Sequence, residues 1–498
     1  MLAWTIYISF IGAAVLMLLP GDKPRLARGL GLLTALGGMI AGCLGVSQFS
    51  KGTPGRLDEI VNLPWIADLH IHYHLAVDGV SAVLVLLTGI AAVVGILFSW
   101  NIEHRAKEFF AMFLALIGGV YGVFLSFDLF LLFVFYEIAI IPKYFLIAIW
   151  GSTRREYGAM KLALYSFIGS AMVLIGLIAA YVVSGSHSFD LVELAKYPFP
   201  ASFQNWAFPL VFIGFAILAG LWPFHTWAPT GHVAAPTAAS MLLAGVVMKL
   251  GAYGAMRVAM ILFPLGLQTW QNTIALLAVI GIVYGAMVAL VQRDFKFVIG
   301  YSSVSHMGFV LLGLMTLTQV GISGAILQMF SHGIIAGLLF GVVGRMVYDR
   351  THTRDLVQLQ PMNLSKLLPF AAVTFVIGGA ASMGLPGFSG FIAELQVVEG
   401  AWVAFPVFTV AAGLGIILGV AYTLRVMIKA FFLQNEPIHT TDAAPHHFGP
   451  ITLPERLGAL VLLAATLVIG LYPRLLMDLI VPAVNSPLFS RMLKGGVS

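Results

Sequence analysis

Cysteine and charged residues are scarce in this chain of 498 residues. Its single cysteine, Cys43, excludes a disulfide framework and any cysteine-ligated cluster. Only 9% of the residues are charged, whereas an ordinary soluble domain carries ~25%. Hydrophobic residues make up 60% of the chain. This balance predicts a protein whose apolar surface faces lipid.

Motifs that bind nucleotides or haem are also missing. The chain has no Gly-rich dinucleotide fingerprint, no Walker sequence and no haem-attachment motif. Three alternating histidines, His70, His72 and His74, are of a type that ligates zinc, but no fourth ligand accompanies them. We therefore expect neither a cofactor nor a metal in this chain. The net charge of +5 comes from short loops between apolar stretches, so it does not predict nucleic-acid binding.

Apolar stretches long enough to cross a bilayer recur along the whole chain. They predict an all-α polytopic membrane protein with about fourteen transmembrane helices. The predicted spans are 2–20, 28–48, 75–99, 108–127, 128–150, 157–184, 206–226, 235–263, 270–292, 296–317, 320–347, 366–399, 405–433 and 456–478. We expect the polar stretches 49–74 and 434–450 to form loops.

Basic residues mark every second loop between these spans. Lys23, Arg105, Arg154, Arg293 and Arg345 all lie in this set of loops, whereas the intervening loops carry few cations. The positive-inside rule places the basic loops in the cytoplasm. Both termini are then expected on the outer side, which agrees with an even number of spans.

Five ionisable residues interrupt apolar stretches: Glu137, Lys249, His306, His332 and Glu394. A charge near the middle of a bilayer costs several kcal/mol unless it is paired, hydrated or neutralised. Buried ion pairs that hold helices together are one explanation. Because intramembrane ionisable groups generally belong to proton or ion pathways, we interpret the set as a candidate pathway.

Two predicted spans contain helix breakers at matching positions. Proline interrupts the seventh span in GLWPFHTWAPTGHVAAPT, and glycine and proline interrupt the twelfth in SMGLPGFSGFIAELQ. Each is the fourth helix of a predicted five-helix repeat, 108–263 or 264–433. Paired broken helices predict two inverted repeats around a transport pathway, although simple kinks at tight packing are the alternative. The remaining segments are 1–107, with three helices and an outer loop, and 434–498, with a cytoplasmic loop and the last helix.

Several segments resemble the antiporter-like membrane subunits of respiratory complex I. They are SFDLFLLFVFYEIAIIPKYFLIAIWG, PFHTWAPTGHVAAPTAASMLLAGVVMKLGAYG, RDFKFVIGYSSVSHMGFVLLG, QMFSHGI and MGLPGFSGFIAE. Length, span count and the string YHLAVDGVSAVLVLL favour the subunit M, or mitochondrial subunit 4, family of NADH-quinone oxidoreductase. Mrp-type cation/proton antiporters and membrane-bound hydrogenase complexes have similar subunits and remain alternatives.

The resemblance implies a proton-translocating subunit of a larger enzyme in the bacterial inner membrane. Glu137 matches a glutamate that gates protons, Lys249 the lysine at the centre of the hydrophilic axis, and Glu394 the acidic residue on the exit side. His306 and His332 match polar positions between the last two. Lysine and histidine are suited to this work because neighbouring charges and desolvation change how strongly they hold protons. Flavin and iron–sulfur clusters are expected in partner subunits, next to neighbouring antiporter-like subunits.

One departure from the family pattern is specific to this chain. The family carries a lysine in the broken seventh helix where this chain has Leu218, whereas Lys143 stands in the fifth span at a usually apolar position. We predict that Lys143 points inward and compensates; the alternative is that it reaches out to the cytoplasmic headgroups. Asp78 and Asp128 are expected to cap helices, and Arg257 is expected at the membrane interface.

Overall fold

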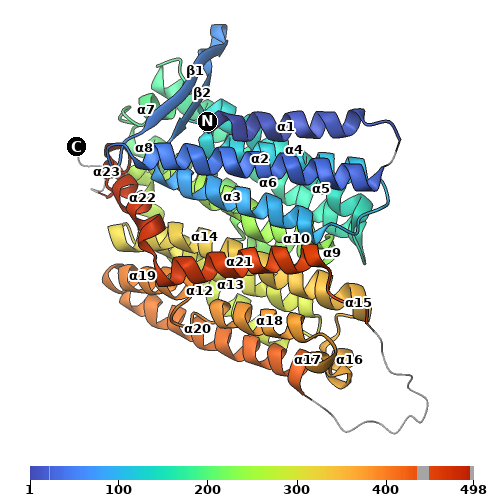
Figure 1. Cartoon of the computed structure of the whole chain (residues 1–498). Coiled ribbons are helices and arrows are strands. Elements are labelled where there is room, and N and C mark those ends of the chain that lie inside the picture. Colours follow the sequence, from blue (N-terminus) through green and yellow to red (C-terminus); the bar gives the residue numbers. More distant parts are fainter. Residues whose placement is uncertain (22, 434–447, 494–498) are drawn as a thin grey trace, which may run out of the picture.

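The computed structural model describes residues 1–21, 23–433 and 448–493, and helices dominate it (Figure 1). Among these residues, twelve helices are long and apolar enough to cross a membrane, and two shorter apolar helices, α1 and α18, accompany them. The predicted all-α polytopic class is confirmed, whereas the count of fourteen spans and their inverted repeats stay predictions. The predicted loop 434–450 falls largely outside the described residues. The helices discussed below are α1 (Ala3–Leu18), α2 (Pro24–Ser50), α3 (Gly79–Phe98), α4 (Ala106–Leu125), α5 (Leu129–Trp150), α6 (Arg155–Ser184), α8 (Ala201–Ala219), α12 (Pro264–Val291), α13 (Phe295–Met315), α14 (Gln319–Gly341), α18 (Pro369–Ser382), α19 (Ser389–Ala404), α20 (Pro406–Met427) and α21 (Leu453–Leu471).

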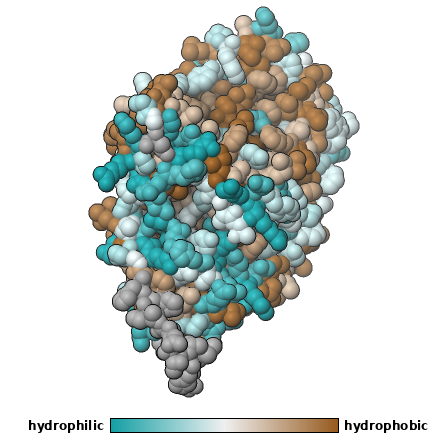
Figure 2. Space-filling model, turned by 90° about the vertical axis from the view of Figure 1, so that its right-hand side faces the viewer, coloured by the Kyte–Doolittle hydropathy of each residue, from teal (hydrophilic) through white to brown (hydrophobic). Residues whose placement is uncertain are grey.

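The long helices run side by side, and α1 begins at the end of the bundle where the short helix α23 (Pro487–Leu493) lies (Figure 1). Figure 2 looks onto the opposite end, where hydrophilic side chains form a broad band between hydrophobic flanks. Exposed Arg154 and Arg155 follow the end of α5 at this opposite end. The arrangement agrees with one basic end and one end that carries the termini. Their assignment to cytoplasm and exterior stays a prediction.

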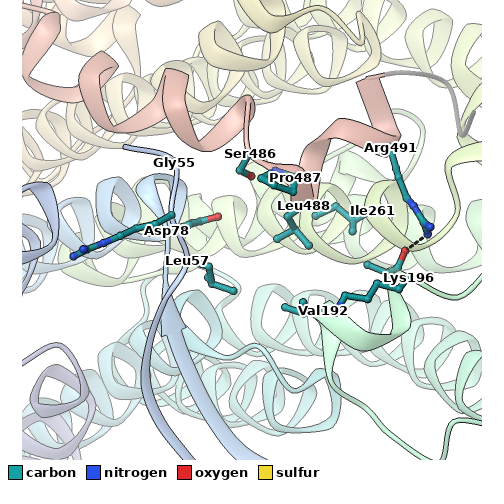
Figure 3. A pocket seen from close by; sticks show the side chains of 12 residues that line it. Gly55, Leu57, Asp78, Val192, Lys196, Ile261, Ser486, Pro487, Leu488 and Arg491 are labelled. Atoms are coloured by element: carbon teal, nitrogen blue, oxygen red, sulfur yellow. Dashed lines mark hydrogen bonds between the residues drawn. The ribbon is translucent and has the colours of Figure 1, made fainter. Parts of the chain in front are cut away.

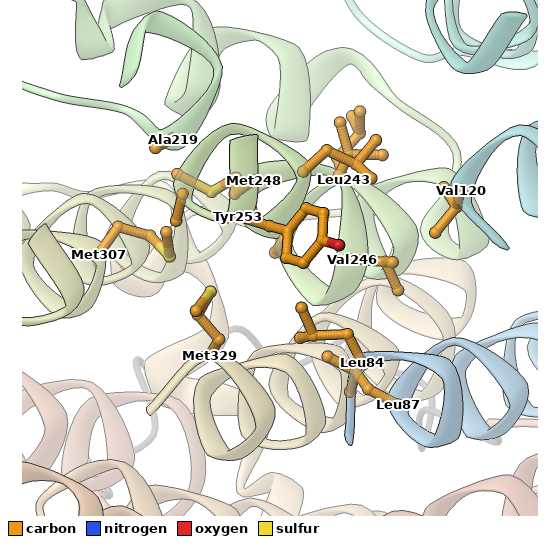
Figure 4. Close-up of a cluster of buried hydrophobic side chains, with 14 of the residues drawn as sticks. Leu84, Leu87, Val120, Ala219, Leu243, Val246, Met248, Tyr253, Met307 and Met329 are labelled. Atoms are coloured by element: carbon orange, nitrogen blue, oxygen red, sulfur yellow. The ribbon is translucent and has the colours of Figure 1, made fainter. Parts of the chain in front are cut away.

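A continuous helical segment through the middle of the bundle has protein on all sides. It consists of α10 (Thr237–Leu242), η3 (Leu243–Val247), α11 (Met248–Gly254) and η4 (Ala255–Met260), and η3 and η4 have the wider π-helical turn. Figure 4 shows Met248 and Tyr253 of this segment close to Met307 and Met329. Helix α8 approaches so closely that a Cβ atom at Gly251 would lie 2.4 Å from the Ala219 nitrogen. Small residues thus bring backbones together, as is usual between membrane helices.

Two helices stop inside the bundle at the predicted interruptions. After α8 ends at Ala219, the chain passes through η2 (Phe224–Thr226) into α9 (Trp227–Ala234), and a similar gap separates α18 from α19. Side chains satisfy part of the freed backbone: the Trp227 indole donates to the Ile217 carbonyl at 2.8 Å. The Ser240 hydroxyl donates to the His232 carbonyl at the same distance. Such internal partners are required because lipid offers none.

The predicted outer loop 49–74 contains regular structure that the sequence analysis did not predict. It contains an antiparallel hairpin of β1 (Asp58–Ile66) and β2 (Ile71–Val77), joined by η1 (Ala67–Leu69). The strands are shorter and more polar than the spans, and their apolar alternation is weak, so the hydropathy pattern conceals them. The last predicted span, 456–478, is too long. Helix α21 ends at Leu471, and α22 (Arg474–Val484) is a separate helix after Pro473.

Arg257 is buried inside the protein, whereas its predicted position at the membrane interface stays a prediction. Its side chain is fully buried and lies 2.7 Å from the Asp78 carboxylate. Asp78 also caps α3 as predicted, because it accepts a hydrogen bond from the Ser81 amide at 2.9 Å. The partner that allows Arg257 to be buried comes from a distant part of the chain, which a pattern of hydropathy does not reveal.

A second polar network ties the hairpin to α5 on the same end of the molecule. Nδ1 of His74 on β2 lies 2.6 Å from the Asp190 carboxylate, and Glu59 lies 3.5 Å from the other ring nitrogen. Asp128 caps α5 as predicted and also accepts a hydrogen bond from the His72 amide at 3.0 Å. The hairpin is therefore held to the start of α5 by carboxylates.

Ionisation of His74 and Asp190 should control the strength of this tether. Burial alone would lower the pKa of His74, but the hydrogen bond and charge of Asp190 outweigh it and raise that pKa above its usual value. Burial would raise the pKa of Asp190, but the hydrogen bond from His74 and two backbone amides lower it. The histidine contribution is therefore complete below about pH 6.5 and is lost as pH rises through the raised pKa. The Asp190 contribution is lost in acid.

We predict that the hairpin opens more readily at pH 9 than at pH 6, so that its backbone amides exchange faster at pH 9. If the His74–Asp190 pair loses about 1 kcal/mol of stabilisation, the equilibrium constant for opening of the hairpin increases roughly fivefold. Hydrogen exchange, corrected for intrinsic rates, measures it. His74→Gln should remove the pH dependence, whereas His70→Asn, a change at an exposed turn residue, should keep it. Equal pH dependence in wild type and His74→Gln would contradict the prediction.

Candidate functional site

Lys249 lies at the centre of the molecule, on the short α-helical stretch between two π-helical turns. Its side chain is completely buried. The Nζ atom donates a hydrogen bond to the Ala244 carbonyl within the first π-helical segment, and it lies 2.7 Å from Nδ1 of His332 on α14. Departures from regular α-helix often mark functional positions because they leave carbonyl groups available. The ammonium group is thus held by a carbonyl and an imidazole, with no carboxylate in direct contact among the described residues.

His306 on α13 continues this line of polar groups. Its ring centre lies 5.5 Å from that of His332, and the two rings are inclined by 32°. Nδ1 of His306 lies 2.9 Å from Oε1 of Glu394 on α19, directly after the interruption of the twelfth predicted span. Four of the predicted site residues, Lys249, His332, His306 and Glu394, therefore form one buried row across three neighbouring helices and the central segment.

The widest step in this row contains a small cavity. A space of about 10 Å³ lies among His306, His332 and Glu394, with Gln328 and Ser382 also in its wall. That volume is near the minimum that holds one water molecule, and the wall offers several polar partners. Gln328 also donates to Glu394 at 3.2 Å, and the Ser382 hydroxyl lies 3.3 Å from Nε2 of His306. A single water could therefore join the two histidines.

Glu137 and Lys143 form a second group on α5, apart from this row. The Glu137 side chain is half-buried and faces the Ser170 hydroxyl of α6. Lys143 is 1% exposed, which places it inside the protein and rules out the alternative of a side chain in the headgroup layer. The predicted inward orientation is confirmed. The role of Lys143 is a separate question.

Several buried polar atoms of α5 and α6 have no hydrogen-bond partner among the described residues. Oε1 of Glu137, Nζ of Lys143 and the Ser166 hydroxyl are buried and accept or donate no hydrogen bond within the described parts of the chain. Leu218, at the position where a lysine was expected, is buried on α8. Tyr136 of α5 contacts Phe215 of α8 edge to face at 5.5 Å. The second group thus lies near α8 but is not joined to Lys249 by a described hydrogen bond or ion pair.

Two buried residues were missed by the sequence analysis. His232 on α9 is fully buried near Lys249 and Lys296, and its ring nitrogens have no partner within the described residues. Lys296, in the first turn of α13, is 2% exposed and donates to the Ala235 carbonyl at 3.0 Å. Both lie in segments used above for the resemblance. The histidine within PTGHVAAPT and the lysine at the start of a helix are the sequence signals that could have identified these two residues as candidates.

No three His, Cys, Asp or Glu side chains gather as a metal site in residues 1–21, 23–433 and 448–493. His72 and His74 instead contact Asn62 and Asp190. The buried groups are lysine, histidine and carboxylate side chains within hydrogen-bonding reach of one another. Such groups exchange protons at ordinary pH when their surroundings change. The arrangement is therefore suited to proton transfer.

Comparisons with known proteins agree with this geometry. A family described as "NADH:quinone oxidoreductase/Mrp antiporter, TM" matches residues 126–419. NADH-quinone oxidoreductase subunit M of Rhodobacter capsulatus is 36% identical over 497 residues, covering 96% of this chain and 94% of the relative. The corresponding subunit of Rickettsia prowazekii is 37% identical and covers 83% of each chain.

Solved structures extend the similarity to the whole fold. A chain of respiratory complex I from Thermus thermophilus with bound NADH superposes with a TM-score of 0.89 at 27% identity, and each chain is fully covered. A chain of the Mrp complex from Dietzia sp. superposes with a TM-score of 0.84 at 22% identity, covering 99% and 98% of the two chains, which shows a shared fold. The chain therefore belongs to the membrane-subunit family that NADH:quinone oxidoreductases share with Mrp antiporters, and its relatives include the M subunits of NADH-quinone oxidoreductase.

Proposed function

We propose that this chain is a proton-translocating membrane subunit of a respiratory NADH-quinone oxidoreductase. The buried row from Lys249 through His332 and His306 to Glu394 carries the proposal, because its members lie within 2.9 Å or are separated by one water-sized cavity. Relatives named as M subunits cover nearly the whole chain. This coverage favours the oxidoreductase over the alternative of an Mrp-type antiporter or hydrogenase-type complex.

In the proposed path, Lys249 stores a proton and His332 receives it. The proton then crosses the water-sized cavity to His306 and reaches Glu394, which releases it toward the outer side. The direct contacts, Lys249 to His332 and His306 to Glu394, are short enough for proton transfer. A change in the charge of a neighbouring group would make Lys249 release its proton, because a buried ammonium depends on nearby charge for its stability.

Protons would enter from the basic end of the bundle. A cavity of about 160 Å³ at that end is lined by Lys296, Ser152 and Asp349, among others. Lys296 donates to the carbonyl of Ala235, the residue that follows α9. His232 lies on α9 and interacts electrostatically with both Lys296 and Lys249. Lys296 and His232 would therefore pass a proton from this cavity to Lys249.

We assign Glu137 and Lys143 to a gate on α5. Lys143 is the cation that interacts electrostatically with Glu137. The unsatisfied oxygen and nitrogen atoms of the two side chains, and the Ser166 hydroxyl of α6, would be hydrated when the gate opens. In this assignment Lys143 replaces the cation that Leu218 does not provide.

The subunit would work beside other membrane subunits, including neighbouring antiporter-like ones, with flavin and iron–sulfur clusters in partners. We propose a bacterial inner membrane location with both termini on the outer side, because the exposed basic loops lie at the other end. The chain itself would then contribute proton transfer and no redox centre.

We predict that Lys249→Ala impairs turnover of the complex and that Lys249→Arg restores it only in part. Arginine keeps the positive charge but does not release its proton. The loss in Lys249→Ala should be at least about a hundredfold, as is typical for removal of a proton-transfer group. NADH-driven acidification of vesicles measures it. Lys161→Arg, a change at a half-buried lysine at the basic end of α6, is the matched control. Full activity of Lys249→Arg would instead indicate a fixed electrostatic role.

We predict further that Lys143→Leu lowers proton pumping by roughly tenfold, because Glu137 loses its cationic neighbour. The double change Lys143→Leu with Leu218→Lys should restore at least part of the rate, because it returns a cation to α8. Vesicle acidification is the measurement, and a native gel verifies that each complex assembles. Normal pumping by Lys143→Leu would show that this lysine has no part in the gate.

A further inference from the structure

A cavity away from the proton path lies at the end of the bundle where α23 lies. Its volume is about 400 Å³, within the range of small-molecule sites. The wall combines the C-terminal segment, the region before the hairpin and the segment around α7 (Leu191–Leu194). Asp78 and Ile261 also belong to the wall, so segments that are far apart in the sequence line one space.

The wall of this cavity is apolar on most sides and cationic on one. Figure 3 shows Leu57, Val192 and Leu488 around the space, with Lys196 and Arg491 together at its right-hand side. The Arg491 guanidinium donates one hydrogen bond to the Ala195 carbonyl, which fixes it at the wall. An apolar chamber with a cationic rim is suited to a molecule with an acyl chain and a negative head group.

The charges at the wall do not cancel. Arg56 pairs with Asp58, which lies 2.5 Å away, and Asp78 pairs with the buried Arg257. Lys196 and Arg491 remain, and neither has a carboxylate partner in the described ranges of the chain. The wall therefore has two unneutralised positive charges, and an anion would gain from both.

The location of the cavity also favours an amphiphile over a small soluble anion. Asp78 begins the membrane-spanning helix α3, and Ile261 directly follows η4, so the cavity lies where membrane segments end. Acyl chains and head groups of a bilayer meet at this depth. A soluble phosphate would satisfy the two cations but would leave the apolar wall unused.

We propose that this cavity binds an anionic amphiphile, with its acyl chain against Leu57, Val192 and Leu488 and its phosphate or carboxylate head between Lys196 and Arg491. The site is independent of the proposed proton path and does not rest on it. A phospholipid and a free fatty acid share this chemistry, so the test separates them.

The test uses the assembled complex in nanodiscs with a photoreactive acyl chain on phosphatidylglycerol, on oleate or on phosphatidylcholine. We expect the first or the second to label peptides that contain residues 192–196 and 486–491, and the one that labels identifies the source. Labelling should fall about fivefold for each charge removed in Lys196→Gln and Arg491→Gln. The charge-conserving pair Lys196→Arg with Arg491→Lys should keep it. Arg474→Gln, a change at an exposed arginine outside the cavity, should also leave it unchanged.

Two results would overturn the proposal. One is equal labelling by phosphatidylcholine, which would mean that the negative head group is not recognised. The other is undiminished labelling in the double Gln variant. A further variant, Leu488→Trp, fills the cavity without changing its charge and should also lose labelling. If Leu488→Trp labels like the wild type, the amphiphile binds only at the surface, and the cavity is not its site. A native gel verifies assembly of every variant before labelling.

Discussion

The cost of keeping the Lys249 ammonium group away from water and lipid constrains the rest of this structure. Its helical segment is wholly enclosed by protein, so neither headgroups nor solvent satisfy the charge. A carbonyl made available by a π-helical turn and an imidazole from α14 do so instead. Neither partner carries a full negative charge, so the ammonium group is stabilised but can still lose its proton. This is the property that a proton store requires.

The polar row places further demands on the helices around it. The exit side of the row depends on the gap between α18 and α19, because this gap allows both Ser382 and Glu394 to contact His306. On the entry side, the break between α9 and α10 has the corresponding place, because Ala235 within it accepts a hydrogen bond from Lys296. Broken helices expose backbone groups that only protein or water satisfies at this depth. Each interruption therefore lies beside polar groups of the proposed proton path.

Much of the fold could be predicted from the sequence because hydropathy and proline act locally. The spans, the two interruptions and the helix caps at Asp78 and Asp128 follow from short stretches of residues. The hairpin 58–77 and the ion pair between Arg257 and Asp78 could not be predicted in this way. The hairpin depends on strand pairing, and the ion pair joins residues far apart in the chain.

The candidate site shows the same division between local and distant information. Lys249, His306, His332 and Glu394 were recognisable as charges in apolar surroundings, and the structure brings them together. Their order and the water-sized cavity between the histidines come from helix packing alone. His232 was overlooked because a lone histidine in an apolar stretch is a weak signal until Lys249 and Lys296 are found beside it.

The central claim is that protons pass through this row, and replacing His306 tests it most directly. In the proposed path, His306 takes the proton from the cavity and passes it to Glu394. His225 is also a buried histidine, and its ring nitrogens have no hydrogen-bond partner in the described ranges, so His225→Leu is a matched control. The account predicts that NADH-driven acidification of vesicles falls by at least about a hundredfold in His306→Leu and much less in the control. Wild-type acidification by an assembled His306→Leu complex would contradict it.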